Sequence, residues 1–274
     1  MPVKERDLMG GLAKGLKVIE AFSAERPRLS IAETADIVGL DRATTRRCLL
    51  TLWELGYAAY DGKFFTVTPR VLRLGIGCLA SLPIPRIVQP YLDALSEKIG
   101  QSSSVSILDE TEIVYIARAA QRRVMSISLM PGSRLPAYCT SMGRVLLAAL
   151  SEDEARSTLE KSALVARTEH TETDIERLLA DIKETRERGY ASIDQEVELG
   201  LVSVAVPLKA AASIDQEVEL GLVSVAVPLK AAGGRVVAAA NIGMAASGRS
   251  MKEVIDHYLP PLLELQADLR QTLV

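Results

Sequence analysis

Residues 28–70 constrain the fold of this 274-residue chain more than any other segment. Two stretches with apolar residues at helical spacing are separated by Gly39, and a short hairpin pattern follows them. Ser30, with Glu33 three residues later, forms a capping box that marks the start of the first helix. Asp41 is a good N-cap for the second helix. Together these signals predict a winged helix-turn-helix.

The second helix and the wing follow from the next residues. Gly56 is positioned to end the helix, because glycine adopts the left-handed conformation that closes many helices. The strands of the wing are expected at 57–60 and 64–67, around the strong hairpin signal Asp61–Gly62. The helix is expected to bury four residues at helical spacing, namely Cys48, Leu49, Leu52 and Leu55.

The polar side chains of the second helix lie in its first turns. A recognition helix reads base edges from these turns, where arginine donates to guanine and threonine contacts thymine methyl groups. Lysine in a wing is suited to a phosphate contact. The predicted DNA-contacting residues are Arg42, Thr44, Thr45, Arg46, Arg47 and Lys63. The alternative, a helical hairpin with a solvated basic face, is disfavoured because caps, turn, polarity and wing all agree.

Charge is distributed unevenly along the chain. Residues 1–75 hold 12 Lys and Arg against 9 Asp and Glu, a net charge of +3, whereas the remaining residues hold 20 against 26, a net charge of −6. A basic head on an acidic body suits a protein that contacts DNA only through its head. We therefore expect a DNA-binding domain over 1–75, followed by a linker over 76–90 and a second domain over 91–274.

The body mixes strand and helix patterns, which predicts an α+β domain around one antiparallel sheet. Three prolines in 82–90 are expected to mark the passage into it, with Pro90 starting a helix that runs to Lys98 and ends at Gly100. Thr171 or Thr173 is expected to cap a helix that ends at Gly189. The expected strands are 102–109, 112–118, 124–130, 203–208 or 224–229, and 236–243, and the remaining helices are 68–81, 141–150, 151–162 and 248–273.

Residues 191–211 recur without a single change as 212–232. Two copies do not make a solenoid, which needs at least three. Identity without drift indicates a recent tandem duplication, or an engineered or selected variant, and removal of one copy leaves 253 residues. We expect the second copy, 224–229, to pair with 236–241 because only that copy is joined to it by a short turn. The first copy, 203–208, is then expected outside the sheet or at its edge.

Other classes of protein are disfavoured. No stretch approaches the ~18 apolar residues of a membrane span, and no signal peptide is evident, so we expect a cytoplasmic protein without membrane contact. The cysteines and histidines lack the spacing of a metal site, so no metal or other cofactor is expected. Cys139 has no predicted base, which argues against an enzyme. The cysteines of the chain are Cys48, Cys78 and Cys139, and its histidines are His170 and His257.

Three long motifs resemble the IclR family of bacterial transcription regulators. They are GLAKGLKVIEAF with LSIAETADIVGLDRATTRRCLLTLWELGYA, then GSRLPAYCTSMGRVLLAAL, then DQEVELGLVSVAVPL with GRVVAAANIG. The middle motif is similar to the subgroup that controls protocatechuate, 4-hydroxybenzoate and β-ketoadipate catabolism. This resemblance implies a winged-helix head, a linker helix and a GAF-like effector domain. It also implies a homodimer or tetramer on palindromic double-stranded operator DNA, and a small carboxylate effector.

The resemblance also implies where the effector binds. The expected residues are Ser141 and Met142 at the start of a helix, Asp194 or its duplicate Asp215, Ser203 or its duplicate Ser224, and Asn241.

Reasoning from the residues adds Thr140, because it and Ser141 can cap a helix whose amino end favours anions. Arg134 and Arg144 are suited to pair with a carboxylate, and Tyr138 is suited to stack on a ring. The alternatives are a surface or ion-paired arginine, a core tyrosine and a plain cap.

The sequence as a whole predicts a ligand-responsive DNA-binding regulator of a catabolic operon for aromatic acids. The expected action is activation, with a small aromatic or dicarboxylic acid as effector. Two alternatives stay open: a repressor of the same family that senses a non-aromatic carboxylate, and an enzyme fused to a DNA-binding head.

Overall fold

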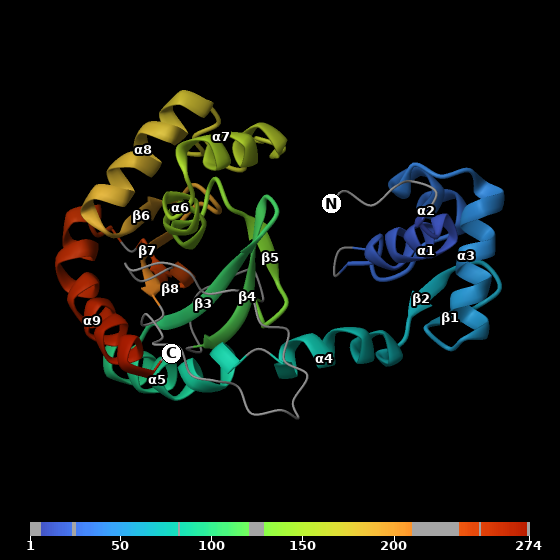
Figure 1. Cartoon of the computed structure of the whole chain (residues 1–274), viewed down its shortest axis with the longest axis horizontal. Coiled ribbons are helices and arrows are strands. Elements are labelled where there is room, and N and C mark those ends of the chain that lie inside the picture. Colours follow the sequence, from blue (N-terminus) through green and yellow to red (C-terminus); the bar gives the residue numbers. More distant parts are fainter. Residues whose placement is uncertain are drawn as a thin grey trace. The chain divides into compact units, whose positions relative to one another are not determined.

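The structure of the chain is a computed structural model that describes residues 7–23, 26–81, 83–120, 129–209, 236–246 and 248–272. The chain forms two compact units, Met1–Ser81 and Leu82–Val274, which are described separately (Figure 1). The division falls inside the predicted linker, 76–90.

The first unit is a helix-turn-helix with a small wing. Its core is formed by Val18, Leu49, Leu52, Ala58 and Phe65. In chain order its elements are α1 (Gly10–Glu20), α2 (Ile31–Val38), α3 (Arg42–Glu54), β1 (Ala58–Tyr60), β2 (Phe65–Val67), the 3₁₀ helix η2 (Pro69–Val71) and α4 (Leu72–Ser81).

The predicted signals of this unit are confirmed. Ser30 and Glu33 form both bonds of the capping box, and Gly39 makes the turn with φ +66°. Gly56, with φ +77°, follows the end of α3. One detail differs, because Leu55 is 53% exposed rather than buried. It lies at the C-cap of α3, beyond the buried face of the helix.

The second unit is built on one antiparallel sheet. Among the described residues the sheet has six strands in the order β5-β4-β3-β8-β7-β6, which confirms the α+β prediction. Sequence patterns missed the short strands β5 and β6. The strands are β3 (Ser102–Asp109), β4 (Glu112–Ala119), β5 (Arg134–Pro136), β6 (Ala191–Asp194), β7 (Leu201–Lys209) and β8 (Val236–Ala245).

Helices cover both faces of this sheet (Figure 1). One face packs against α5 (Pro83–Ile99) and α9 (Met251–Thr272), through residues such as Leu92 and Leu262. The other face packs against α6 (Ser141–Ala148). Helix α8 (Ile175–Arg188) packs on α6, and α7 (Glu152–Lys161) packs on α8, so that Leu147, Leu159 and Leu178 belong to one buried cluster. The sheet face under α6 is the one on which a pocket forms.

Two predicted helix starts are wrong. Helix α5 begins at Pro83 rather than Pro90, because the first turn of a helix tolerates proline, whose missing N–H would have had no partner there. Helix α8 is capped by Asp174, whose Oδ1 accepts from the backbone N–H of Arg177 at 2.9 Å, rather than by Thr171 or Thr173. Most of the predicted strand 124–130 lies outside the described residues.

The prediction about the duplicated segment is also wrong. The first copy, not the second, provides β6 and β7, and β7 pairs with β8 from Leu201↔Ala245 to Lys209↔Val236. Residues 224–229 lie outside the described residues.

The short junction between α8 and β6 explains why the first copy is used. Gly189, with φ +80°, ends α8, the Arg188 side chain donates to the Tyr190 carbonyl at 2.7 Å, and the buried Ala191 starts β6. Use of the second copy for both strands would insert 21 residues into this tight junction, and its use for β7 alone would insert them into the turn between β6 and β7.

Across the part of the chain that the structure describes, no helix is long and apolar enough to cross a membrane. In the same residues no group of three or more His, Cys, Asp or Glu side chains is arranged to hold a metal ion.

Candidate functional site

The candidate DNA-binding surface is the exposed side of α3. Asp41 caps this helix, because its Oδ1 accepts from the backbone N–H of Thr44 at 2.8 Å. Arg42, Arg46 and Arg47 are exposed in its first two turns, and Thr44 is half-buried. The three arginines therefore lie on the outside of the unit, on the part of the helix that reads bases in this motif.

Thr45 requires a correction. Its side chain is 0% exposed and belongs to the same buried face of α3 as Leu49 and Leu52. Residues 45, 49 and 52 follow the helical spacing of four and three, so this face points into the domain. Thr45 therefore contributes to the packing of the helix and not to its exposed surface.

Lys63 lies at the tip of the wing. Asp61 organises this turn, since its Oδ1 accepts from the backbone N–H groups of Lys63 and Phe64 at 2.9 and 2.7 Å. The exposed Lys63 ammonium lies 5.0 Å from the centre of the Phe64 ring. The turn contains four residues, 61–64, whereas the predicted strand bounds leave three, 61–63. It leaves the Lys63 charge accessible to a phosphate.

The candidate ligand site is a pocket between the sheet and the amino end of α6. It holds about 470 Å³ of empty space, including the part open to solvent. Polar residues from the sheet and from α6 lie on its wall together with apolar residues from several loops. The lining residues are Tyr115, Arg118, Leu129, Leu135, Thr140, Ser141, Met142, Val197, Leu201, Ser203, Asn241 and Gly243.

The amino end of α6 is held tightly against the pocket. Thr140 caps the helix by accepting from the backbone N–H of Gly143 at 3.1 Å. The Ser141 and Ser203 hydroxyls lie 2.8 Å apart in a hydrogen bond that joins the helix to β7. A helix amino end carries a partial positive charge, so this wall of the pocket favours an anion.

The floor of the pocket is a polar row across three neighbouring strands. Ser104 on β3 pairs with Arg118 on β4 and with Asn241 on β8, so their three side chains share one face of the sheet. Arg118 Nη1 donates to Ser104 Oγ at 2.9 Å. The row places a guanidinium, a hydroxyl and an amide side by side under the helix.

Burial shifts the acidity of two groups on this floor. It raises the pKa of Tyr115 to about 12, which keeps the phenol neutral at physiological pH. It also lowers the pKa of Arg118, because removal from water disfavours the charged form.

Of the predicted effector residues, the structure brings five together in the pocket: Thr140, Ser141, Met142, Ser203 and Asn241. Tyr115 and Arg118 were not predicted. The signal that was available is the single arginine that follows the apolar run at 113–117. Asp215 and Ser224 lie outside the described residues.

Three predicted residues lie away from the pocket lining. The half-exposed Arg134 is held by Asp109 and Glu112, at 2.7 and 2.6 Å. Tyr138 is buried, and its hydroxyl donates to the carbonyl of Val165 at 2.6 Å. Asp194 is exposed at the end of β6. Ion pairing, core packing and strand direction therefore separate these side chains from the other five.

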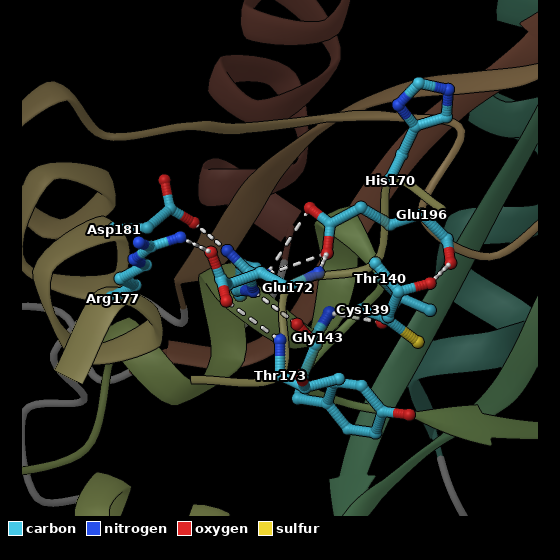
Figure 2. A network of polar contacts seen from close by, with 12 residues as sticks. Cys139, Thr140, Gly143, His170, Glu172, Thr173, Arg177, Asp181 and Glu196 are labelled. Carbon is cyan, nitrogen blue, oxygen red and sulfur yellow. Dashed lines mark hydrogen bonds and ion pairs between the residues drawn. The ribbon is translucent and has the colours of Figure 1, made fainter. Parts of the chain in front are cut away.

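A buried ionic network supports the pocket from behind. Arg144 on α6 pairs with Asp181 on α8 and, at 3.0 Å, with Glu196 in the turn between β6 and β7. Glu196 also accepts from the backbone N–H of Glu172 at 3.2 Å (Figure 2). Burial raises the pKa of Glu196, and the Arg144 charge opposes that rise. The network fixes the turn that carries Val197, one of the lining residues.

Known protein families match both the amino-terminal and the carboxy-terminal part of the chain. The family described as "IclR helix-turn-helix domain" matches residues 11–62. The family described as "Bacterial transcriptional regulator IclR C-terminal" matches residues 76–214.

Two curated relatives match most of the chain. The Pca regulon regulatory protein of Pseudomonas putida is 39% identical, over 96% of this chain and 84% of the relative. The p-hydroxybenzoate hydroxylase transcriptional activator of Acinetobacter baylyi is 36% identical, over 75% of this chain and 78% of the relative.

Two solved structures extend the comparison. A putative transcriptional regulator from Rhodococcus sp. RHA1 has a TM-score of 0.74 and 41% identity, and the match covers 97% of this chain and 98% of that one. The inducer-binding domain of a PobR double mutant from Acinetobacter, in complex with 3-hydroxybenzoic acid, has a TM-score of 0.56 and 28% identity. That match covers 68% of this chain and 97% of the domain.

Proposed function

This chain belongs to the IclR family of bacterial transcriptional regulators, and on that premise we propose that it controls genes for aromatic-acid breakdown in response to a small carboxylate. It is a DNA-binding transcription regulator with an effector domain rather than an enzyme. The observation that carries the proposal is the pocket under α6, where a guanidinium and a helix amino end lie among apolar side chains.

The relatives support the class of effector. One curated relative is a transcriptional activator for p-hydroxybenzoate hydroxylase, and a solved inducer-binding domain holds 3-hydroxybenzoic acid. A hydroxybenzoate carries a carboxylate, a flat apolar ring and a hydroxyl group, and the pocket offers a partner for each. We propose activation rather than repression on the same basis, and a reporter gene under the chain's own target promoter distinguishes the two.

The effector proposal is tested by thermal unfolding of the full chain with 4-hydroxybenzoate, 3-hydroxybenzoate, protocatechuate, β-ketoadipate and muconate. Binding to the native state raises the melting temperature as the ligand concentration exceeds Kd. We expect at least one aromatic acid to raise it, with acetate as the control. A rise with β-ketoadipate or muconate alone would restrict the effector to dicarboxylates. No rise with any of these acids would contradict the proposal.

We further propose that α3 reads the operator through Arg42, Thr44, Arg46 and Arg47, with Lys63 on the backbone. The test is binding to a duplex that the wild-type chain selects from a random-sequence pool. Arg46→Ala and Arg47→Ala are each expected to weaken binding about tenfold or more, since a bidentate arginine–guanine pair discriminates by roughly 1–3 kcal/mol.

Arg156→Ala is the matched control, because Arg156 is a half-exposed arginine of the second unit that pairs with Glu176 at 2.6 Å. It should bind like the wild type. The affinity for the duplex should also fall steeply as the salt concentration rises, because binding releases counterions from the DNA phosphates. Unchanged binding by both α3 variants would remove α3 from the interface.

A homodimer or a tetramer is the proposed assembly, because helix-turn-helix proteins commonly read two half-sites of a palindrome as dimers. Sedimentation of the chain alone and with the selected duplex tests it. A single monomeric species on DNA would contradict it.

A further inference from the structure

We propose that Arg118 binds the carboxylate of the effector, and that this contact orients the ligand with its acid group toward β4 and its ring toward β7. The inference rests on the proposed function, and it assigns the charged end of the ligand to a residue that no sequence pattern had singled out.

A β-bulge is what puts Arg118 in the pocket. The pairing of β3 with β4 shifts between Val105 and Ser106, so that Val105 lies opposite Ala117 and Ser106 lies opposite Tyr115. Ile116 is the extra residue, and it packs on the opposite face of the sheet. Tyr115 and Arg118 are three positions apart, a spacing that puts side chains on opposite faces of a regular strand. The bulge brings both onto the pocket face.

The surroundings of Arg118 favour a carboxylate partner. A guanidinium has five N–H donors in a planar fork, so Arg118 can hold Ser104 and a two-oxygen anion together. The amino end of α6 lines the same pocket and adds a partial positive charge. An acid group under α6 would therefore contact the Arg118 guanidinium on one side and the helix amino end on the other.

The remaining lining residues suit the rest of an aromatic acid. Leu129, Leu135, Val197 and Leu201 provide apolar contacts for a ring. Ser203 lies on β7, three strands from Arg118 in the sheet order, and two residues along β7 from Ala205, which is in register with Arg118. The proposed orientation places the ring between Arg118 and Ser203, with a ring hydroxyl near Ser203 and Ser141.

The experiment compares an acid with its neutral isostere. Calorimetric titration of the full chain with 4-hydroxybenzoate and 4-hydroxybenzamide gives the preference of the pocket for a charged group. We expect the wild type to prefer the acid by about 10- to 100-fold, as a charge-assisted hydrogen bond implies. Arg118→Gln should lose most of this preference because it loses affinity for the acid, while its affinity for the amide stays near the wild-type value.

Two further variants separate charge from structure. Arg118→Lys keeps the charge but not the planar fork, so it should retain part of the preference even if Arg118→Gln folds poorly. Arg134→Gln is the control, since Arg134 lies on the adjacent strand β5 but pairs with Asp109 and Glu112. It should keep the full preference. Thermal unfolding without ligand checks that each variant is folded.

The possible results of these titrations distinguish the assignment of Arg118 from the proposed effector. If the wild type binds the acid and Arg118→Gln keeps the full acid preference, the assignment of Arg118 is overturned while the proposed effector stands. Equal affinity of the wild type for the acid and for the amide also overturns the assignment of Arg118. If the wild type binds neither 4-hydroxybenzoate nor any acid of the panel, the proposed effector itself fails and this inference fails with it.

Discussion

Gly143 shows how closely the amino end of α6 packs. A Cβ atom built at this position would lie 2.1 Å from the carbonyl oxygen of Ala137 and 2.5 Å from its Cα. Both are backbone atoms of the segment that leads into the helix, so the contact cannot be relieved by a side-chain rotation. The missing side chain is therefore what lets the Thr140 cap form beside the pocket.

Gly143→Ala is expected to destabilise the second unit by about 1–3 kcal/mol, the usual cost of forcing extra atoms into a packed interior. Urea unfolding measures this change. Gly243→Ala is the control within the same unit, because its new Cβ would meet nothing closer than an Asn241 side-chain atom at 4.0 Å. Equal stability of the two variants would show that the segment before α6 can move away.

At the scale of an element, α3 depends on its cap. Asp41 accepts from the backbone N–H of Thr44, and this bond and its neighbours hold the pKa of the Asp41 carboxyl below its ordinary value of 3.8. A lowered pKa means that the cap stabilises the fold above pH 3.8 and that this contribution is lost as the pH falls through the lowered value. The cap sets the first turn, where the exposed arginines lie.

Asp41→Ala should therefore lower the melting temperature of the chain by several degrees at pH 7, because the N–H of Thr44 loses its acceptor. Asp41→Ser retains an N-cap and should stay close to the wild type. The difference between Asp41→Ala and the wild type should shrink as the pH falls below 3.8. A difference that is the same at pH 3 and pH 7 would argue against a charged cap.

At the scale of the whole molecule, the duplicated segment is the unusual feature. The fold needs one copy of β6 and β7, and the chain carries the sequence for both strands twice. Deleting 191–211 and deleting 212–232 produce the same 253-residue sequence, so deletion alone cannot tell the copies apart. A substitution in one copy can, because it makes the two unequal.

Val204→Asp is the informative change, since Val204 is 0% exposed between the sheet and α9. In the 253-residue chain the buried charge should unfold the second unit, because its cost approaches the ~5–15 kcal/mol stability of a domain. In the 274-residue chain we expect a much smaller loss, because 212–232 can replace 191–211. Thermal unfolding of the two chains compares them.

The control is the double substitution of Val204→Asp with Val225→Asp, which changes both copies. In this variant neither copy can replace the other, so the 274-residue chain should lose as much stability as the 253-residue chain. If Val204→Asp alone unfolds the 274-residue chain as fully as the 253-residue chain, the second copy does not substitute for the first.

The sequence by itself determined the features that depend on neighbours three or four residues away. The capping box at Ser30, the turn at Gly39, the Asp41 cap and the exposed Arg46 all follow from such local hydrogen bonds and from helical spacing. The alternation of apolar residues likewise indicated most of the strands. These local signals, with the family resemblance, were enough for the fold class and for the exposed arginines of α3, although not for the burial of Thr45.

Only the tertiary structure decided what depends on contacts between distant residues. The bulge at Ile116 arises from the pairing of β3 with β4, and it places Arg118 on the pocket face. The spacing of residues in the sequence does not indicate this bulge. Arg134 is drawn away by ion pairs that form only when β5 joins the sheet. The two copies are identical, so no residue in them can specify which one pairs with β8. The short connections on both sides of β6 favour the first copy, because use of the second copy would insert 21 residues either into the α8–β6 junction or into the turn between β6 and β7.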